Sequence, residues 1–106
     1  MNGVRVVWLL IATLAGHAQA ADLAPEFWDR PRSAQAVLAQ PAIRQAVAVL
    51  QSRSDARMLI VHGTRQESQA QAEELRAWLV ALAVESARVQ LRADLAAATI
   101  RLEIVD

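Results

Sequence analysis

The side chains best suited to bind a ligand follow a short apolar run near the middle of the chain. They are His62, Thr64, Arg65, Gln71 and Arg76. Guanidinium groups bind carboxylates through charge-assisted hydrogen bonds, so Arg65 and Arg76, which cluster in sequence with Glu73 and Glu74, predict a polar recess that grips a carboxylate of a peptide or glycan. The competing interpretation is a solvated helix face, on which Glu73 and Arg76 form an i,i+3 pair that contributes roughly 0.3 kcal/mol.

Neither a metal centre nor a catalytic set is expected. The chain has no cysteine and two histidines, of which His17 lies in an expected leader, whereas a zinc site needs three or four converging ligands. A nucleophilic triad would need Ser54 or Ser68 beside His62, with an orienting carboxylate, and the spacing does not indicate one. A histidine at a strand end beside glycine is more typical of a packed turn. We therefore expect a protein that binds and does not catalyse, with no cofactor.

A strand, a turn and a helix position these side chains. The apolar run Met58–Val61 predicts a central strand, and Gly63 permits a sharp turn after it. Thr64 and Glu67 fit a capping box at the start of the following helix, as do Ser68 and Gln71 one turn later. Apolar residues then recur at i, i+3, i+4 and i+7, as in an amphipathic helix: Leu75, Trp78, Leu79 and Leu82.

The flanking segments predict one more helix and two more strands. Ser33 is a plausible N-cap, and Pro41 predicts a break near Gln40, with the main helix from Pro41 to Ser52. Residues 89–94 and 100–105 alternate between apolar and polar, as strands with one solvated face do. The order β-α-β-α-β-β predicts an α+β fold, a two-layer α/β sandwich with two helices on one face of a mixed sheet.

The first twenty residues have the pattern of a cleaved signal peptide. A short segment with Arg5 precedes the apolar run Val6–Ala15, and Ala18-Gln19-Ala20 supplies the small-x-small cleavage pattern. The alternative is an N-terminal membrane anchor, but the apolar run is well short of the ~20 residues that span a bilayer. We therefore expect cleavage after Ala20 and a protein in the periplasm, without a transmembrane segment after cleavage.

The remainder divides into an N-terminal segment, residues 21–32, and a domain, residues 33–106. Pro25 and Pro31 favour an extended segment or edge strand, in which Phe27 and Trp28 point to opposite faces. Which of the two is buried stays open. Removal of Arg5 leaves a net charge of −1, so no basic field is present to recruit nucleic acid. The oligomeric state is not specified by these patterns.

At this point the chain resembles a shortened, divergent OmpA-like domain, the peptidoglycan-binding module of outer-membrane and flagellar-motor proteins. Val61-His-Gly-Thr-Arg65 is similar to the family's Gly-His-Thr-Asp motif, with Gly and His exchanged. Trp78-Leu79 resembles its Tyr-Leu step, Ala83-Val84 its Gly-Ile link, and Arg101-Leu-Glu-Ile104 its last strand. The resemblance covers Phe27 to Asp106 and implies an exported module associated with peptidoglycan.

The resemblance breaks at the ligand pair. In the family, the motif's Asp binds the ammonium of diaminopimelate and a helix Arg binds its carboxylate. Those positions are Arg65 and Gln71 here, and Arg76 lies about 140° around the helix from Gln71. Two functions therefore stay open: a non-catalytic envelope module that binds peptidoglycan, or an accessory subunit that keeps the fold and docks onto an envelope protein.

Overall fold

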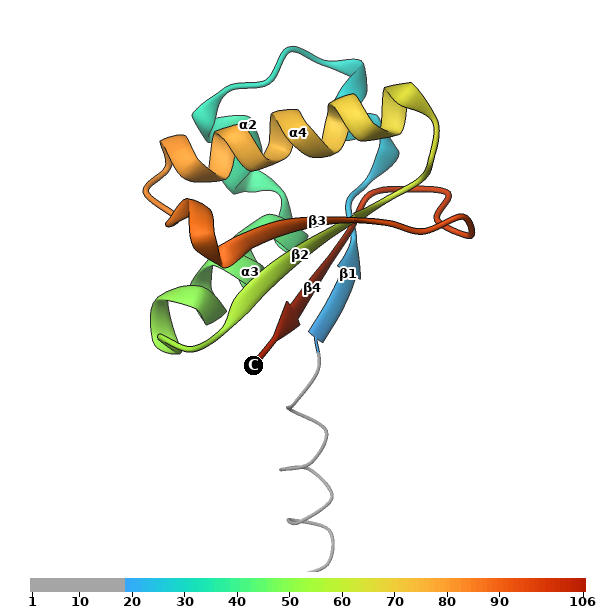
Figure 1. Ribbon diagram of the computed structural model, residues 1–106. Coiled ribbons are helices and arrows are strands. Elements are labelled where there is room, and N and C mark those ends of the chain that lie inside the picture. Colours follow the sequence, from blue (N-terminus) through green and yellow to red (C-terminus); the bar gives the residue numbers. More distant parts are fainter. Residues whose placement is uncertain (1–18) are drawn as a thin grey trace, which may run out of the picture.

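The computed structural model describes residues 19–106, which form a four-stranded mixed sheet and its covering helices (Figure 1). The predicted fold class is confirmed. The predicted signal peptide comprises residues 1–20, and residues 1–18 of it lie outside the described residues. The elements are β1 (Gln19–Asp22), η1 (Pro25–Asp29), α2 (Ala34–Ala39), α3 (Pro41–Ser52), β2 (Arg57–His62), α4 (Gln66–Ala81), η2 (Ser86–Arg88), β3 (Val89–Ala93) and β4 (Arg101–Val105).

The sheet places the two ends of the described chain side by side. Its strand order is β1-β4-β2-β3, with β2 and β3 parallel and the other two pairs antiparallel. The parallel β2–β3 pair requires a crossover, which α4 provides. β1 is an edge strand. The predicted cleavage point after Ala20 falls within this strand, since Ala20 pairs with Glu103 and Ala21 pairs with Leu102.

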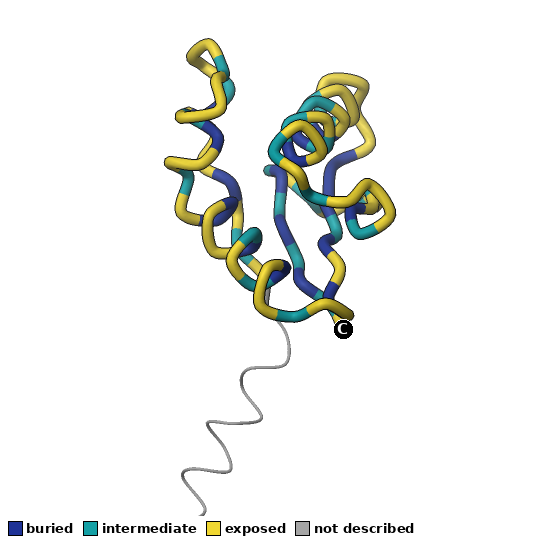
Figure 2. Tube along the Cα trace, turned by 90° about the vertical axis from the view of Figure 1, so that its left-hand side faces the viewer, coloured by how far each residue is buried: buried dark blue, intermediate teal, exposed yellow. Residues whose placement is uncertain are grey.

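One face of the sheet carries the core. Its β2 residues are Met58 and Ile60, which lie level with Val89 of β3 and Leu102 of β4. Both long helices turn their buried stripes toward this face, and Figure 2 shows the buried residues gathered between the sheet and the helices. The stripes consist of Ala42, Ile43, Ala46 and Leu50 on α3, and Ala72, Leu75 and Leu79 on α4.

The opposite face of the sheet is polar and carries ion pairs. Arg101 pairs with Asp22 and Glu103, and Glu103 also pairs with Arg92. Val61 is buried on this face, level with Arg92 and Arg101 in the neighbouring strands. The charged side chains thus share this face with apolar residues of the two central strands, Leu59 and Val61 of β2 and Val105 of β4.

The helix boundaries largely follow the sequence signals. Ser33 Oγ accepts a hydrogen bond from the Ala36 N–H, at 3.1 Å, and the chain breaks at Gln40 before Pro41 opens α3. The predicted capping boxes of α4 are wrong, because Arg65 is the N-cap and its side chain makes no capping bond. Ser68 Oγ instead accepts from the Gly63 N–H and so stabilises the turn before the helix.

The predicted extended conformation of the N-terminal segment is wrong for residues 25–29. Pro25 begins the 3₁₀-helix η1, since a proline ring fixes φ near the helical value and suits a first helical position. Phe27 is buried, and Trp28 is half-buried and meets it edge to face, with ring centroids 4.9 Å apart. The segment is part of the domain, because β1 extends the sheet and Leu23 and Phe27 enter the core.

Candidate functional site

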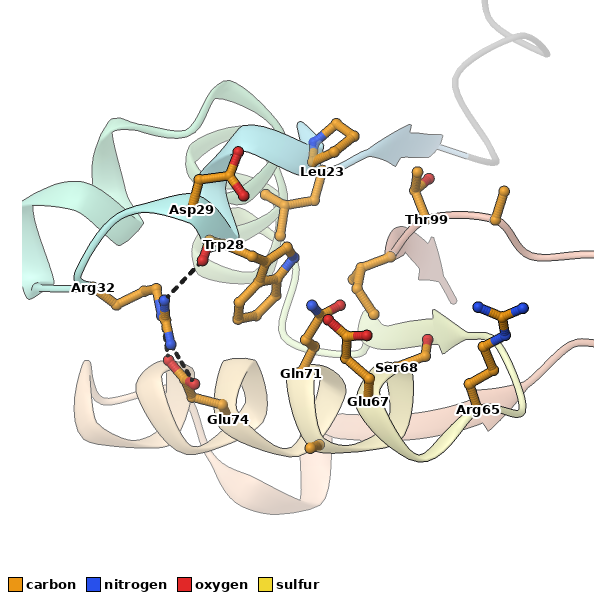
Figure 3. Close-up of a pocket in the computed structure, with 14 residues that line it drawn as sticks. Leu23, Trp28, Asp29, Arg32, Arg65, Glu67, Ser68, Gln71, Glu74 and Thr99 are labelled. Atoms are coloured by element: carbon orange, nitrogen blue, oxygen red, sulfur yellow. Dashed lines mark hydrogen bonds and ion pairs between the residues drawn. The ribbon is translucent and has the colours of Figure 1, made fainter.

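A cleft of about 560 Å³ lies between the N-terminal segment and the first turns of α4 (Figure 3). Three segments that are distant in sequence form its walls. The N-terminal segment contributes Trp28, Asp29 and Arg32, and the loop before β4 contributes Thr99 and Ile100. The N-terminal part of α4 and its cap line the remaining wall with Arg65, Glu67, Ser68, Gln71 and Glu74.

An ion pair ties two of these walls together at one end of the cleft. Arg32 donates through Nε and Nη2 to the two carboxylate oxygens of Glu74, at 2.7 and 3.0 Å (Figure 3). The guanidinium also lies over the Trp28 ring, 5.3 Å from its centroid, and donates to the Trp28 carbonyl. Trp78 Nε1 donates to the same Glu74 carboxylate, at 3.2 Å. The planar guanidinium matches the carboxylate in two parallel bonds, the strongest arrangement for such a pair.

These contacts favour the ionised carboxylate of Glu74. The hydrogen bond from Arg32 lowers the pKa of Glu74 below its ordinary value of 4.5, and Trp78 adds to that effect, while desolvation opposes it. The same bond raises the pKa of Arg32. Both groups are thus committed to each other and are not free to hold a ligand.

Two free charges of the cleft, Arg65 and Glu67, lie toward its other end, and a third, Asp29, lies near Trp28 (Figure 3). Within residues 19–106, Arg65, Glu67 and Asp29 enter no ion pair, and all three side chains are exposed. Gln71 is half-buried and lies with Glu67 between Trp28 and Arg65 (Figure 3). The cleft therefore offers a free cation, free carboxylates, an amide and an aromatic wall, which suit a ligand with both ionic and apolar parts.

Four of the five predicted site residues line cavities on opposite flanks of α4, and Thr64 lines neither cavity. Arg65 and Gln71 line the cleft. His62 and Arg76 line a second cavity, of about 520 Å³, between α4 and β3. The prediction of one recess that contains both Arg65 and Arg76 is wrong, because the buried stripe of α4 separates the two flanks.

Arg76 has a structural role that neither sequence interpretation anticipated. Its Nε donates to the Val89 carbonyl at 3.1 Å, and its Nη2 donates to the Ser86 carbonyl at 3.0 Å. The alternative Glu73–Arg76 ion pair is also absent from the described residues. Arg76 instead holds η2 and the start of β3 against the helix.

His62 and Thr64 do not face the cleft. His62 is buried, and its Nδ1 lies 2.7 Å from the Gly63 carbonyl oxygen. Because that carbonyl can only accept, Nδ1 carries the proton. Thr64 is exposed, and its carbonyl accepts from Gln69 Nε2. Both residues build the turn, as a histidine beside glycine at a strand end commonly does.

Sequence reasoning missed the contribution of the N-terminal segment to the site. Trp28, Asp29 and Arg32 belong to the segment that the sequence predicts to be extended, and none of them is among the predicted site residues. Glu74 and Trp78 stand four residues apart and so share one helix face, where Trp78 Nε1 donates to the Glu74 carboxylate. This local pattern does not indicate the more distant partner, Arg32.

Within residues 19–106, no cluster of three or more His, Cys, Asp or Glu side chains is placed to hold a metal ion. No helix in the same range has the length and apolar character needed to cross a bilayer. Comparison of the chain with protein-family models, with curated proteins and with solved structures returns no match.

Proposed function

We propose that this protein is an exported, non-catalytic module of the cell envelope, and that its cleft binds the peptide part of peptidoglycan. One observation carries the proposal: Arg65 and Gln71, the two positions that the OmpA-like resemblance aligns with the family's ligand pair, line the same cleft. The fold class and the polar lining of the cleft support it. The leader-like sequence of residues 1–20 supports export to the compartment that contains this ligand.

The residues of the cleft suggest how such a ligand is held. A stem-peptide carboxylate accepts charge-assisted hydrogen bonds from Arg65. An ammonium group of the same ligand is attracted to Glu67 or Asp29, the free carboxylates of the cleft. Gln71 supplies both a donor and an acceptor, and Trp28 offers an apolar face. The cation stands where the family has an anion, so the ligand lies in a different orientation from that of the family.

An accessory subunit that docks onto an envelope protein is the second candidate. The charge reversal at Arg65 favours it, because the ammonium group that the family's Asp binds would meet a cation here. In that case the cleft receives a segment of a protein and not a cell-wall peptide.

Co-sedimentation with purified peptidoglycan sacculi tests the proposal. We expect saturable binding that a free diaminopimelate-containing tripeptide competes away, and a quenched or shifted Trp28 fluorescence in the complex. Arg65→Glu should abolish the binding. Arg57→Glu is the matched control, since Arg57 is exposed on β2 outside the cleft. If the wild type sediments no more than a soluble control protein, the peptidoglycan proposal is wrong and protein partners become the target.

A further inference from the structure

β3 is an edge strand with a free side and a cavity beside it. Within residues 19–106, β3 pairs with β2 alone. The cavity of about 520 Å³ lies between this strand and α4, lined by His62, Gln69, Glu73, Arg76 and Leu91. Gln69, Glu73 and Arg76 follow the i, i+4, i+7 spacing, so they form one stripe of the helix that runs beside the strand. This groove is on the opposite flank of α4 from the cleft.

The register shows which backbone groups of β3 are free. The Asp94 N–H donates to the His62 carbonyl at 2.8 Å, so residue 94 directs its backbone groups toward β2. Alternate residues of a strand direct these groups to the same side, and Leu91 and Ala93 therefore direct theirs away from β2. The Val89 carbonyl also faces away, because it accepts a hydrogen bond from Arg76.

We propose that this groove binds an extended peptide of a partner protein, which adds to β3 as a fifth strand beside α4. Strand addition gives affinity through backbone hydrogen bonds, and adjacent side-chain pockets give specificity. Here the N–H and C=O groups of Leu91 and Ala93 supply the backbone bonds. The side chains of the peptide that point to the helix side enter the cavity beside Glu73.

The free edge is suited to a peptide and not to a second copy of this chain. Arg76 and η2 occupy the Val89 end of the strand, which leaves the outward groups of two residues. A symmetric antiparallel pairing that uses these two residues would place Arg92 directly opposite Arg92 of the second copy, and like charges directly opposite each other destabilise a strand pair. A short peptide needs only the free end and a side-chain anchor.

The charges of the groove favour a basic residue at the anchor position. Arg76 directs Nε and Nη2 to backbone carbonyls. Glu73 is exposed and has no ion-pair partner within the described residues. It is the carboxylate of this stripe that a Lys or Arg side chain of the peptide can reach.

Fluorescence anisotropy with three capped, fluorescein-labelled pentapeptides tests the proposal. They have the sequence Thr-Val-Xaa-Val-Thr, with Lys, Glu or Leu at the centre. We expect the Lys peptide to bind best, and its backbone N-methylated form not to bind. In the complex, the amides of Leu91 and Ala93 should become protected from hydrogen exchange, while those of the cleft should not change.

Two variants and one control separate the contribution of the β3 backbone from that of the Glu73 side chain. Ala93→Pro removes an outward N–H without touching the bonds to β2, and proline is tolerated at such edge positions, so we expect about tenfold weaker binding. Glu73→Gln should weaken the Lys peptide by about two- to fivefold and leave the Leu peptide unchanged. Glu26→Gln, an exposed position on η1 outside both cavities, should have no effect. The proposal is overturned if none of the three peptides binds, or if bound peptide leaves the Leu91 and Ala93 amides unprotected.

Discussion

Arg32 and Glu74, 42 positions apart in the chain, form a two-bond ion pair that joins the N-terminal segment to α4. Phe27 attaches the same segment to the domain through apolar contacts in the core, whereas Arg32 attaches it through an ion pair. The ion pair helps to fix the distance between the two walls of the cleft, because within residues 19–106 it is the ion pair that joins them. Removal of one partner is therefore expected to affect the cleft more than the core.

The first prediction concerns the pH dependence of this pair. Arg32 lowers the pKa of Glu74, so the folded state favours the carboxylate more than the unfolded state does. The stabilisation is then complete above the ordinary pKa of 4.5 and is lost as the pH falls through the lowered value of the folded state. Glu74→Gln should therefore unfold more easily than the wild type at pH 7, and the difference should shrink below pH 4.5.

Urea unfolding of both proteins between pH 3 and pH 7 measures this effect, roughly the range in which carboxylates titrate. Since both side chains are partly exposed, the difference should also become smaller in 1 M salt, where the Debye length is about 3 Å. Glu73→Gln serves as the control, because Glu73 has no such partner in the described chain. A pH-independent difference would contradict an electrostatic origin.

Arg88 is expected to be the most important arginine for stability. Its guanidinium donates to the carbonyls of Leu50, Arg53 and Ala56, at 2.6 to 3.0 Å. These carbonyls belong to the end of α3 and the turn after it, where a cation is favourable. Arg88→Ala should lower the free energy of unfolding by about 2 kcal/mol, as loss of hydrogen bonds to a charged group does. Arg57→Ala should change it by less than about 0.5 kcal/mol, and equal effects of the two substitutions would refute the capping role.

Ala83 is a site where glycine should increase stability. α4 ends in a Schellman motif, in which Val84 N–H bonds to the Leu79 carbonyl and Ala83 N–H to the Val80 carbonyl. Ala83 has φ 77°, in the left-handed region, which costs an L-residue roughly 1 kcal/mol. Ala83→Gly should therefore raise the free energy of unfolding by about 0.5 kcal/mol, after the extra entropy of the unfolded chain is counted.

Thermal unfolding measures this gain against Ala77→Gly, an exposed position in the interior of the same helix. That control should lose about 1 kcal/mol, because glycine is a poor helix former. If both variants lose stability, the left-handed conformation of Ala83 is not strained.

Phe27 and Trp28 should separate stability from binding. Phe27 is buried and Trp28 lines the cleft. Phe27→Ala should cost about 3 kcal/mol through the cavity it leaves. Trp28→Ala should cost less and should weaken any ligand of the cleft. Chemical unfolding and sacculus binding of both variants check this; a Trp28→Ala protein with unchanged binding would exclude the aromatic wall from the site.

The periodicity of apolar residues predicted most of the fold, because burial of one face of a strand or helix imposes that periodicity on the sequence. The alternation in residues 100–105 gave the buried Leu102 and Ile104, and Pro41 gave the boundary between α2 and α3. The central position of β2 followed from its continuous apolar run. In each case, the burial or backbone geometry of a short segment determines which residues that segment can contain.

The site was less accessible to sequence reasoning, because it depends on contacts between distant segments. Nothing near Arg32 in the sequence indicates that its partner is Glu74. The opposite placement of Gln71 and Arg76 did follow from the helical period, and the structure confirms that they lie on different flanks. The conformation of Pro25–Asp29 was missed because proline suits both an extended segment and a first helical turn.

The position of β4 makes the sheet depend on contacts between distant parts of the sequence. This strand lies inside the sheet, between β1 and β2. Until Arg101–Val105 is in place, β1 has no neighbour in the sheet and β2 pairs with β3 alone. The pairing of residues 19–22 with residues 101–104 closes a long loop of chain, and such nonlocal pairings form slowly because the loop entropy must be lost first. We therefore expect the docking of β4 to be a late step in folding.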